Sequence, residues 1–415
     1  MQLDIRDNNN PISSVNNAIN YLLIILLIFL QDSPYFLEPD VNKLLWVIIL
    51  FFLLLIAIKR KKELIERKIL LILLTTWFMI FVQYLIYGGG FTPAAVYKPV
   101  WIFYTTYLVY ILLGVKYYKY LFNIIYFIAI YTSVIYVLQT FIPSFDTLLT
   151  WAFEEVFKIS WADWPRTILI YSIPQESGYL LKRNSGLFHE AGAYGIYLIL
   201  AIIVNTLFTK QPFNKRNLFL SAVLLTTFST VSYVMLFLYY GYHIVSSKMH
   251  SAAKLALIVL FVLITSDVYT RVDFLKDKIY HRLEIQKYAV EDKRINVRGR
   301  FYAMMMSLQS FSESPIFGRG IIGITKYDVG ETGSFGYGIG GMLARYGIIY
   351  TMIYLVYYYK GYKWLSTKYG FTNIHGTVVF IIVNIGLFTQ IFFFHTPFIY
   401  PLYLAIYKRS KRMIE

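Results

Sequence analysis

Long apolar runs separated by short polar segments extend along the whole chain, and this pattern is its strongest signal. Most of these runs approach the ~20 residues that an α-helix needs to cross a bilayer, so they predict membrane spans. Residues 217–247 suit either two short helices with a turn at residues 229–232 or one long tilted helix. The predicted spans are 16–30, 41–58, 69–87, 100–115, 121–142, 190–208, 217–230, 232–247, 254–266, 336–359, 372–394 and 397–407.

The composition agrees with this pattern. Of the 415 residues, 58% are hydrophobic and 15% are charged, whereas a soluble domain is roughly half apolar and about a quarter charged. The mean hydropathy of +0.55 also excludes a disordered chain. We therefore expect an all-α polytopic membrane protein with about twelve transmembrane helices. The chain has no cysteine, which excludes a disulfide framework, cysteine-based metal centres and thiol nucleophiles.

The net charge of +16 is distributed unevenly between the two sides of the predicted membrane protein. With twelve spans, one side receives 21 of the 39 Lys and Arg residues and only 5 of the 23 acidic residues. The positive-inside rule makes this side cytoplasmic and places both termini on it. A single helix at 217–247 would move the later basic loops to the other side, so the charge favours two helices. Since topology accounts for the charge, we expect no nucleic-acid partner.

Two predicted external connections are much longer than the others, and such loops often carry function. The first contains Trp151, Trp161 and Trp164, which suit either an interfacial helix or aromatic contacts to a sugar. The chain then divides into N-terminal helices at 1–142, a loop at 143–189, central helices at 190–266, a larger loop at 267–335, and C-terminal helices with a cytoplasmic tail at 336–415.

Arginine is the most informative residue type on the external side. Its planar guanidinium can bind phosphate through two hydrogen bonds, so arginines at a membrane surface suit a lipid diphosphate. The alternative is that each arginine pairs with a nearby carboxylate or a lipid head group. The external arginines close to the two long loops are Arg183, Arg298, Arg300 and Arg319.

Arg345 is a different case, because it lies inside the predicted span 336–359. A charge at this depth is costly and usually faces a cavity, which makes Arg345 a candidate for the reaction centre. The glycine-rich segment 333–341 precedes it. Such a segment predicts either close packing between helices or a groove for a ligand.

Residues 318–323 match the G-x-G-x-x-G pattern, but the strand and acidic residue of a dinucleotide site do not accompany them. We expect a turn whose backbone amides, with Arg319, can face an anion. The available general bases are Glu331 in the large loop and Glu190, which is alternatively a carboxylate stabilised at a helix N-terminus. The histidines lack metal-ligand spacing, so we predict neither a metal nor another cofactor.

Residues 183–192 read R-N-S-G-L-F-H-E-A-G and are similar to a known signature. The pattern R-x-x-G-L-F-x-E-P-G belongs to the O-antigen polymerase (Wzy-type) and O-antigen ligase superfamily, and only Ala191 departs clearly from it. Residues 298–320 resemble the family's G-R…P-x-x-G-x-G stretch in the large periplasmic loop. Residues 340–349 resemble the start of the helix that follows this loop.

The resemblance covers mainly residues 180–360 and implies a GT-C-like glycosyltransferase of the bacterial inner membrane. The implied reaction joins undecaprenyl-diphosphate-linked oligosaccharide repeat units into a surface polysaccharide, either O-antigen of lipopolysaccharide or capsule. The external arginines would hold the diphosphate, and Glu190, Glu331 and Arg345 would serve catalysis. The expected partners are this lipid-linked oligosaccharide, membrane lipid and, as a further candidate, a chain-length regulator protein.

Three alternatives remain open. An O-antigen ligase usually carries a histidine before the glycine matched by Gly347, but this chain has no histidine between residues 282 and 374, which favours a polymerase. A lipid-linked oligosaccharide flippase or other transporter would share the spans and arginines but generally has short loops. A glycosyltransferase that uses a polyprenyl-phosphate sugar would place an acidic residue such as Asp40 in the first external loop.

Overall fold

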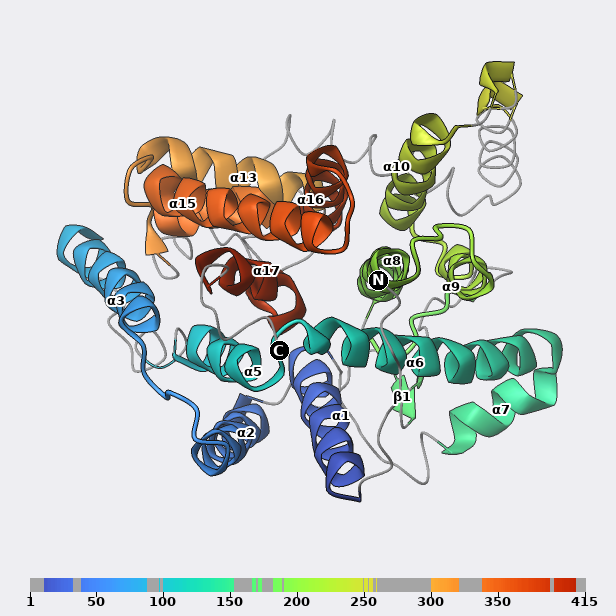
Figure 1. The fold of residues 1–415 in the computed structure, drawn as a ribbon, viewed down its shortest axis with the longest axis horizontal. Helices are drawn as coiled ribbons and strands as arrows, with labels where there is room; N and C mark the ends of the chain where they lie inside the picture. The colour runs from blue at the N-terminus through green and yellow to red at the C-terminus, as the bar shows by residue number, and fades with distance from the viewer. Residues whose placement is uncertain are drawn as a thin grey trace.

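The computed structural model shows a helical protein, drawn in Figure 1. It describes residues 11–32, 39–87, 97, 100–152, 166–168, 171–173, 182–188, 190–248, 250–252, 254–256, 259, 300–320, 338–388 and 392–407. Within these ranges, the strands β1 (Arg166–Ile168) and β2 (Tyr171–Ile173) form one antiparallel hairpin.

The helices follow the chain in the order in which the apolar runs occur. The first part contains α1 (Pro11–Asp32), α2 (Pro39–Lys59), α3 (Arg67–Tyr87), the π-helical turn η2 (Val100–Tyr104), α5 (Thr105–Leu113), α6 (Lys116–Phe141) and α7 (Pro143–Trp151). The second part contains α8 (Ala191–Thr209), α9 (Lys215–Leu225), α10 (Thr230–Ser246), α13 (Arg300–Glu313), α15 (Gly338–Lys368), α16 (Asn373–Phe388), the 3-10 turn η4 (Phe392–Phe394) and α17 (Thr396–Tyr407).

Four helices of the described part are long and apolar enough to cross a membrane, namely α3, α6, α8 and α15. Large apolar side chains are exposed on several helices, including Phe52, Phe78 and Phe127. Exposed apolar surface of this kind marks helix faces that meet lipid. The prediction of an all-α membrane protein is confirmed to this extent, while the total of about twelve spans stays a prediction.

Residues 217–247 form two helices, as the charge distribution favoured. α9 ends at Leu225 and α10 begins at Thr230. The turn between them lies earlier than the predicted residues 229–232, because Ser229 is the N-cap of α10 and its side chain accepts a hydrogen bond from Ser232 N. A serine at this position stabilises the first turn of a helix, so the helix begins directly after it.

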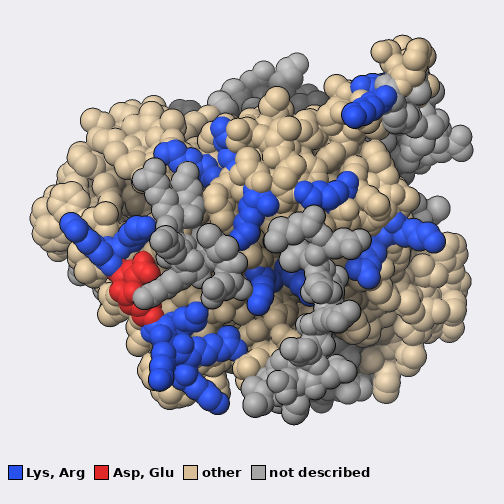
Figure 2. Space-filling view, in the orientation of Figure 1, with Lys and Arg blue, Asp and Glu red and all other residues tan. Residues whose placement is uncertain are grey.

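Helix ends that the alternating topology assigns to the basic side contact one another. These contacts join the start of α1 to the end of α2, the start of α3 to the end of α17, and the end of α8 to the start of α16. The pairs are Arg60 with Asn16 and Asn20, Lys68 with the Ile406 carbonyl, and Lys210 over the Phe371 ring. Figure 2 shows Lys and Arg side chains spread over one face of the molecule, with acidic side chains confined to one group.

Helix ends assigned to the opposite side also contact one another. The end of α3 meets the start of α15, the end of α6 meets the segment before α8, and that segment meets the turn between α9 and α10. The pairs are Gln83 with Arg345, Tyr136 with Lys182, and Asn184 with Thr226. Other contacts do not follow the alternating order, because Tyr104 and Tyr107, near the external start of the predicted span 100–115, donate to the carbonyls of Leu64 and Glu63 on the basic side. The orientation of the spans stays a prediction.

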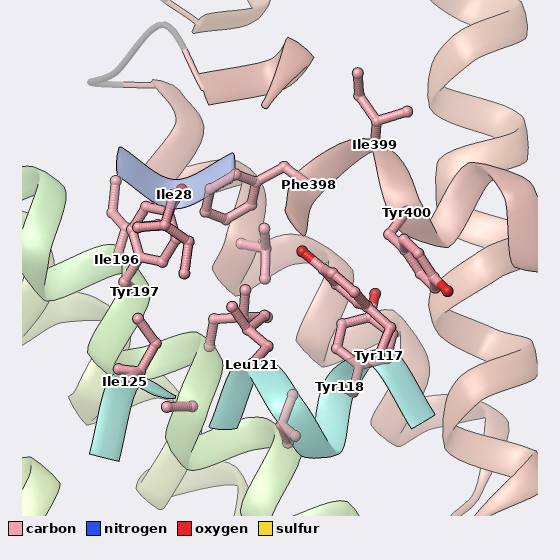
Figure 3. Packing of buried hydrophobic residues seen from close by; sticks show 14 of the residues in the cluster. Ile28, Tyr117, Tyr118, Leu121, Ile125, Ile196, Tyr197, Phe398, Ile399 and Tyr400 are labelled. Atoms are coloured by element: carbon pink, nitrogen blue, oxygen red, sulfur yellow. The ribbon is translucent and has the colours of Figure 1, made fainter. Parts of the chain in front are cut away.

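The core of the bundle is formed around α8 and α17, which lie between the other helices in Figure 1. Almost every residue of α8 is buried, and so is most of α17. Figure 3 shows Tyr117 and Tyr400 side by side in this core, with ring centroids 4.1 Å apart. The hydroxyls of Tyr400 and Tyr403 donate to the carbonyls of Gly114 and Phe103, each at 2.6 Å. Tyrosine thus fills space and also satisfies backbone oxygens, which no water reaches in a membrane.

The two long predicted loops contain regular structure. The loop at 143–189 begins with α7 and includes the β1–β2 hairpin, and the loop at 267–335 includes α13. α13 packs against α15, and its small polar side chains Ser307 and Ser310 are buried. Gly338 at the start of α15 has φ +65 and lies against the backbone of Phe388. Close helix packing in the glycine-rich segment is therefore confirmed at this residue.

Candidate functional site

A tight turn formed by residues 182–188 leads into α8 and contains Arg183. Asn184 builds it, because its side-chain oxygen accepts a hydrogen bond from Gly186 N and its side-chain nitrogen donates to Thr226 Oγ1, both at 3.0 Å. The backbone N–H of Asn184 also donates to the Thr226 carbonyl at 3.0 Å. The turn is therefore fixed both internally and to the segment that joins α9 to α10.

The G-L-F residues of the turn have packing roles. Gly186 has φ +57, and a Cβ there would lie 2.8 Å from the Tyr194 ring, so glycine suits both the backbone and the space. Leu187 and Phe188 are completely buried. The Phe188 ring stacks on those of Tyr194 and Tyr197, with centroids 5.5 and 4.6 Å away. These three residues anchor the turn in the core.

Arg183 and Glu190 flank the anchored residues, and both are half-buried. Arg183 Nε donates to the Thr227 carbonyl at 3.2 Å, which holds the guanidinium beside the α9–α10 turn. Glu190 is the N-cap of α8, and its side chain makes no capping hydrogen bond to the helix amides. Because a helix N-terminus carries partial positive charge, the field there favours the ionised carboxylate. The turn therefore presents one arginine and one carboxylate from its two ends.

The segment before the turn is tied to the end of α6 and to α7. Tyr136 OH donates to the Lys182 carbonyl at 2.8 Å, and the Lys182 ammonium pairs with Asp146. Gln139 Nε2 donates to the same carboxylate at 2.9 Å, and Gln139 Oε1 accepts from Tyr171 OH. Burial opposes ionisation of Asp146, but the hydrogen bonds from Lys182 and Gln139 and the charge of Lys182 outweigh it, so the pKa of Asp146 is lowered.

A second arginine-bearing element lies where α15 is interrupted. Gly347 has φ 71 and ψ 179, which are not helical values, although the helix continues on both sides. Ile348 N donates to the Pro315 carbonyl, and the Ala344 carbonyl accepts from Arg319 N, both at 2.8 Å. In an uninterrupted helix these two groups would bond to each other. The segment after α13 is thus inserted into the break and satisfies both backbone groups.

We call the contact between residues 314–320 and residues 344–348 the α13–α15 junction. At Gly318 and Gly347 the two backbone segments are in direct contact. A Cβ on Gly347 would lie 2.0 Å from the Ile316 carbonyl oxygen, and a Cβ on Gly318 would lie 2.5 Å from Gly347 N. Both glycines also have positive φ, at +71 and +65. Only glycine fits either position without moving backbone.

The outer end of α3 completes the α13–α15 junction. The buried amide of Gln83 donates from Nε2 to the carbonyls of Phe317 and Arg345, at 2.7 and 2.6 Å. Tyr87, one helical turn further along, contacts the Ser314 hydroxyl. The sequence analysis missed Gln83. The signal that could have identified it is a glutamine within an otherwise apolar span, since a polar side chain there commonly makes a helix–helix contact.

The α13–α15 junction brings Arg319 and Arg345 onto neighbouring backbone segments. Arg319 pairs with Glu313 at the end of α13, so for this residue the alternative of pairing with a carboxylate is confirmed. Arg345 is half-buried at the break. The N–H groups of Gly318 and Arg319 both donate to carbonyls of the chain itself. The prediction that this glycine-rich turn offers these amides to an anion is therefore wrong.

Several predicted site residues lie outside the described part of the chain. Arg298 and Glu331 lie there, as do Trp161 and Trp164 of the first long loop. Arg300 is the first residue of α13, but its side chain is not among those described. The predicted residues that the structure places are Arg183, Glu190, Arg319, Arg345 and, at the end of α7, the exposed Trp151.

The contacts of these residues assign them to two parts of the fold. Arg183 and Glu190 lie with α8 and the α9–α10 turn, whereas Arg319 and Arg345 lie where α3, α13 and α15 meet. Among the described residues, no group of three or more His, Cys, Asp or Glu side chains is placed to hold a metal ion.

Comparison of the chain with protein families, with curated proteins and with solved structures finds no match. The similarity to the O-antigen polymerase and ligase superfamily consequently depends on the motif residues alone and stays a prediction. What the structure adds is a physical reason for the G-L-F part of the motif, because Gly186, Leu187 and Phe188 each have a packing role in the turn.

Proposed function

We propose that this protein is a membrane glycosyltransferase of the bacterial inner membrane. In this proposal it polymerises undecaprenyl-diphosphate-linked oligosaccharide repeat units into a surface polysaccharide on the external face, with both termini in the cytoplasm. The observation that supports it best is the turn before α8, where a rigid backbone carries Arg183 and Glu190 at a membrane-proximal helix end.

The first chemical requirement is charge stabilisation of the leaving group. Transfer of the growing glycan breaks the bond between its reducing-end sugar and the diphosphate, so negative charge develops on the diphosphate oxygen. The hydrogen bond from Arg183 Nε to the Thr227 carbonyl fixes the orientation of a guanidinium, a group whose fork of N–H donors suits diphosphate oxygens. A pre-oriented arginine of this kind stabilises the departing charge without reorganising during the reaction. Arg345, close to the break in α15, is proposed as a second such group.

The second requirement is a group that orients or deprotonates the acceptor hydroxyl. Glu190 is proposed for this role, because it is the N-cap of α8 and lies seven residues after Arg183. Glu331, outside the described residues, is the second candidate. The lipid carrier would lie against apolar helix faces, and exposed side chains such as Phe78 and Phe81 of α3 provide these next to the α13–α15 junction.

The ligase and the flippase remain the competing functions, and one experiment separates all three. In a strain that lacks this protein, the proposal expects single repeat units that still reach their usual acceptor and a missing ladder of longer chains. Loss of a ligase would instead leave long chains on undecaprenyl diphosphate. Loss of a flippase would trap single units on the cytoplasmic side. The measurements are a gel of the surface glycan and an assay of the lipid-linked pool, and long chains on the lipid carrier would refute the proposal.

A further inference from the structure

α3 is a peripheral helix with an unexpected set of polar contacts. Its most apolar stretch is only 28% buried, and large side chains such as Leu74 and Phe78 are exposed on it. Yet it reaches α15 through two hydrogen bonds made by side chains on one face, namely Thr76 to Tyr350 and Gln83 to the α13–α15 junction. Since apolar packing gains little in lipid, such polar contacts have a large share in holding a membrane helix in place.

Gln83 makes the most demanding of these contacts. Its side chain is 6% exposed, and its Nε2 atom donates to two carbonyls from different segments, Phe317 in the loop after α13 and Arg345 in α15. The other side of the amide is equally confined, because a Cβ on Gly320 would lie 2.8 Å from Gln83 Oε1. A single amide group therefore bridges the two backbone segments and adds to the direct hydrogen bonds from Ile348 N and Arg319 N.

The chemistry of the contact requires an amide at this position. Two carbonyl oxygens face one side chain, so that side chain must supply two N–H donors, which the NH₂ group of glutamine does. A glutamate would place a charged oxygen against two acceptors, and a methionine would fill the space without donating. In either case buried carbonyl groups would lose their partner, which is unfavourable in a medium without water.

We propose that Gln83 is a positioning residue that fixes the α13–α15 junction and thereby the location of Arg345 and Arg319. This inference depends on the proposed function, in which Arg345 stabilises the leaving diphosphate. Gln83 does not touch the substrate in this scheme. It acts through the backbone of Arg345, whose carbonyl it holds at 2.6 Å.

A positioning role predicts a specific kinetic effect. Displacing a transition-state group by about 1 Å can cost ~100-fold in rate, so Gln83→Met should lower kcat by about 10- to 100-fold while KM for the donor changes by less than about threefold. The substrate for this assay is the lipid-linked single repeat that accumulates in the deletion strain, used with protein in nanodiscs. The matched control is Thr76→Val, which removes a hydrogen bond from the same face of α3 but leaves the α13–α15 junction intact.

A second readout reports on the α13–α15 junction without any catalysis. The chain has no cysteine, so Ser310→Cys, at a buried position of α13 that is 1% exposed, provides a unique thiol. Its labelling by a maleimide should be slow in the parent and in Thr76→Val. In Gln83→Met it should be at least several-fold faster, because α13 is released from α15.

Gly320→Ala provides a second test, because it changes the segment after α13 that lies against the Gln83 amide. The added methyl group would displace the Gln83 amide without changing α3 and would also strain the backbone, because Gly320 has φ +70, so the loss of kcat should be at least as large as that of Gln83→Met. This variant also keeps the test decisive if Gln83→Met fails to fold.

The possible results separate the two proposals. Slower turnover with faster labelling and unchanged KM supports the positioning role. If both Gln83→Met and Gly320→Ala turn over normally while Arg345→Ala is inactive, the positioning role is wrong and the proposed function stands. If Arg183→Ala and Arg345→Ala both polymerise normally, the proposed function itself fails, and with it the positioning role.

Discussion

The turn before α8 and the α13–α15 junction hold arginines by different means. Both use a glycine with positive φ, Gly186 in the turn and Gly347 in the junction. The residues that shape the turn lie mainly between 182 and 197, and the α9–α10 segment, Tyr136 of α6 and Ser172 of β2 bond to it from further away. The α13–α15 junction is assembled from three segments, and Gln83 of α3 lies 234 and 262 residues before its two partners, Phe317 and Arg345. The comparison shows that the residues of one site can follow one another in the sequence, whereas those of the other site are brought together only by the fold.

The largest expected effect separates the two glycines. Gly347→Ala should cost at least about 2 kcal/mol of stability and abolish activity, because its Cβ would lie 2.0 Å from a backbone oxygen that has no room to move. Gly186→Ala should cost less, since its Cβ would meet the ring of Tyr194, and a side chain can shift.

Thermal unfolding in one detergent measures both changes. Gly241→Ala is the matched control, because nothing lies within 4 Å of a Cβ at this helical position and alanine is the better helix former. If Gly347→Ala and Gly186→Ala lower the melting temperature equally, a methyl group against backbone is no more costly here than one against a side chain, and the prediction is wrong.

The next effect concerns the three arginines that the structure places. Arg183→Ala and Arg345→Ala should each reduce polymer formation by about 100-fold or more, as expected when a charge-stabilising group is removed. Arg319→Ala should reduce it by less than about tenfold, because Glu313 already pairs with this guanidinium. Lysine at position 183 should rescue only in part, since a point charge does not reproduce the arginine fork.

The ladder of surface glycan measures this effect, with protein level in the membrane as the control. An Arg319→Ala variant as inactive as Arg183→Ala would mean that Glu313 is displaced when substrate binds.

An informative effect is expected at Glu190, the N-cap of α8. Glu190→Gln keeps the size and hydrogen-bonding capacity of the side chain but removes its charge and basicity. If Glu190 acts as a base, kcat should fall by about 100-fold or more, whereas an N-cap role alone should lower the melting temperature slightly and leave kcat nearly intact. Normal polymerisation by both Glu190→Gln and Glu331→Gln would exclude both carboxylates as the base.

The smallest effect tests how the turn is tied to α7. The pKa of Asp146 is lowered in the folded protein, so its pairing with Lys182 stabilises the fold above the usual carboxyl pKa of about 4 and is lost as the pH falls through the lowered value. Wild type should therefore melt slightly higher than Asp146→Asn at pH 7, and the two should converge as the pH falls below about 4. A difference that persists in acid would indicate that the carboxylate charge is not the stabilising feature.

The sequence predicted more of the turn before α8 than of the α13–α15 junction. Arg183, Gly186 and Glu190 were found because a contiguous segment carries them and local backbone needs fix their spacing. Gln83 was missed because nothing near it in the sequence indicates that a carbonyl from α15 will lie 2.6 Å away. The helical character of the chain and the two separate helices within 217–247 were predictable from hydropathy and charge, whereas α13 was missed since its burial depends on a helix that follows it.

The same reasoning explains an error within the glycine-rich turn at residues 318–323. The spacing of its glycines correctly indicated an unusual backbone, and Gly318 and Gly320 do have positive φ. It was interpreted as a site for an anion because such turns often expose their amides. Here the Ala344 carbonyl at the break in α15 accepts from Arg319 N, and the Ser314 carbonyl accepts from Gly318 N. Only the tertiary structure reveals the competition from Ala344.

The position of α17 has a consequence for the order of events during synthesis. Tyr400 donates to the Gly114 carbonyl, which the ribosome adds 286 residues earlier. At about 5 to 20 residues per second, the earlier helices wait about 15 to 60 s for this partner. Until then, the Gly114 carbonyl has the local hydrogen bond from Tyr117 N but not the one from Tyr400. The bundle is therefore completed only after its last described helix enters the membrane, and the N-terminal helices spend that interval as an open assembly.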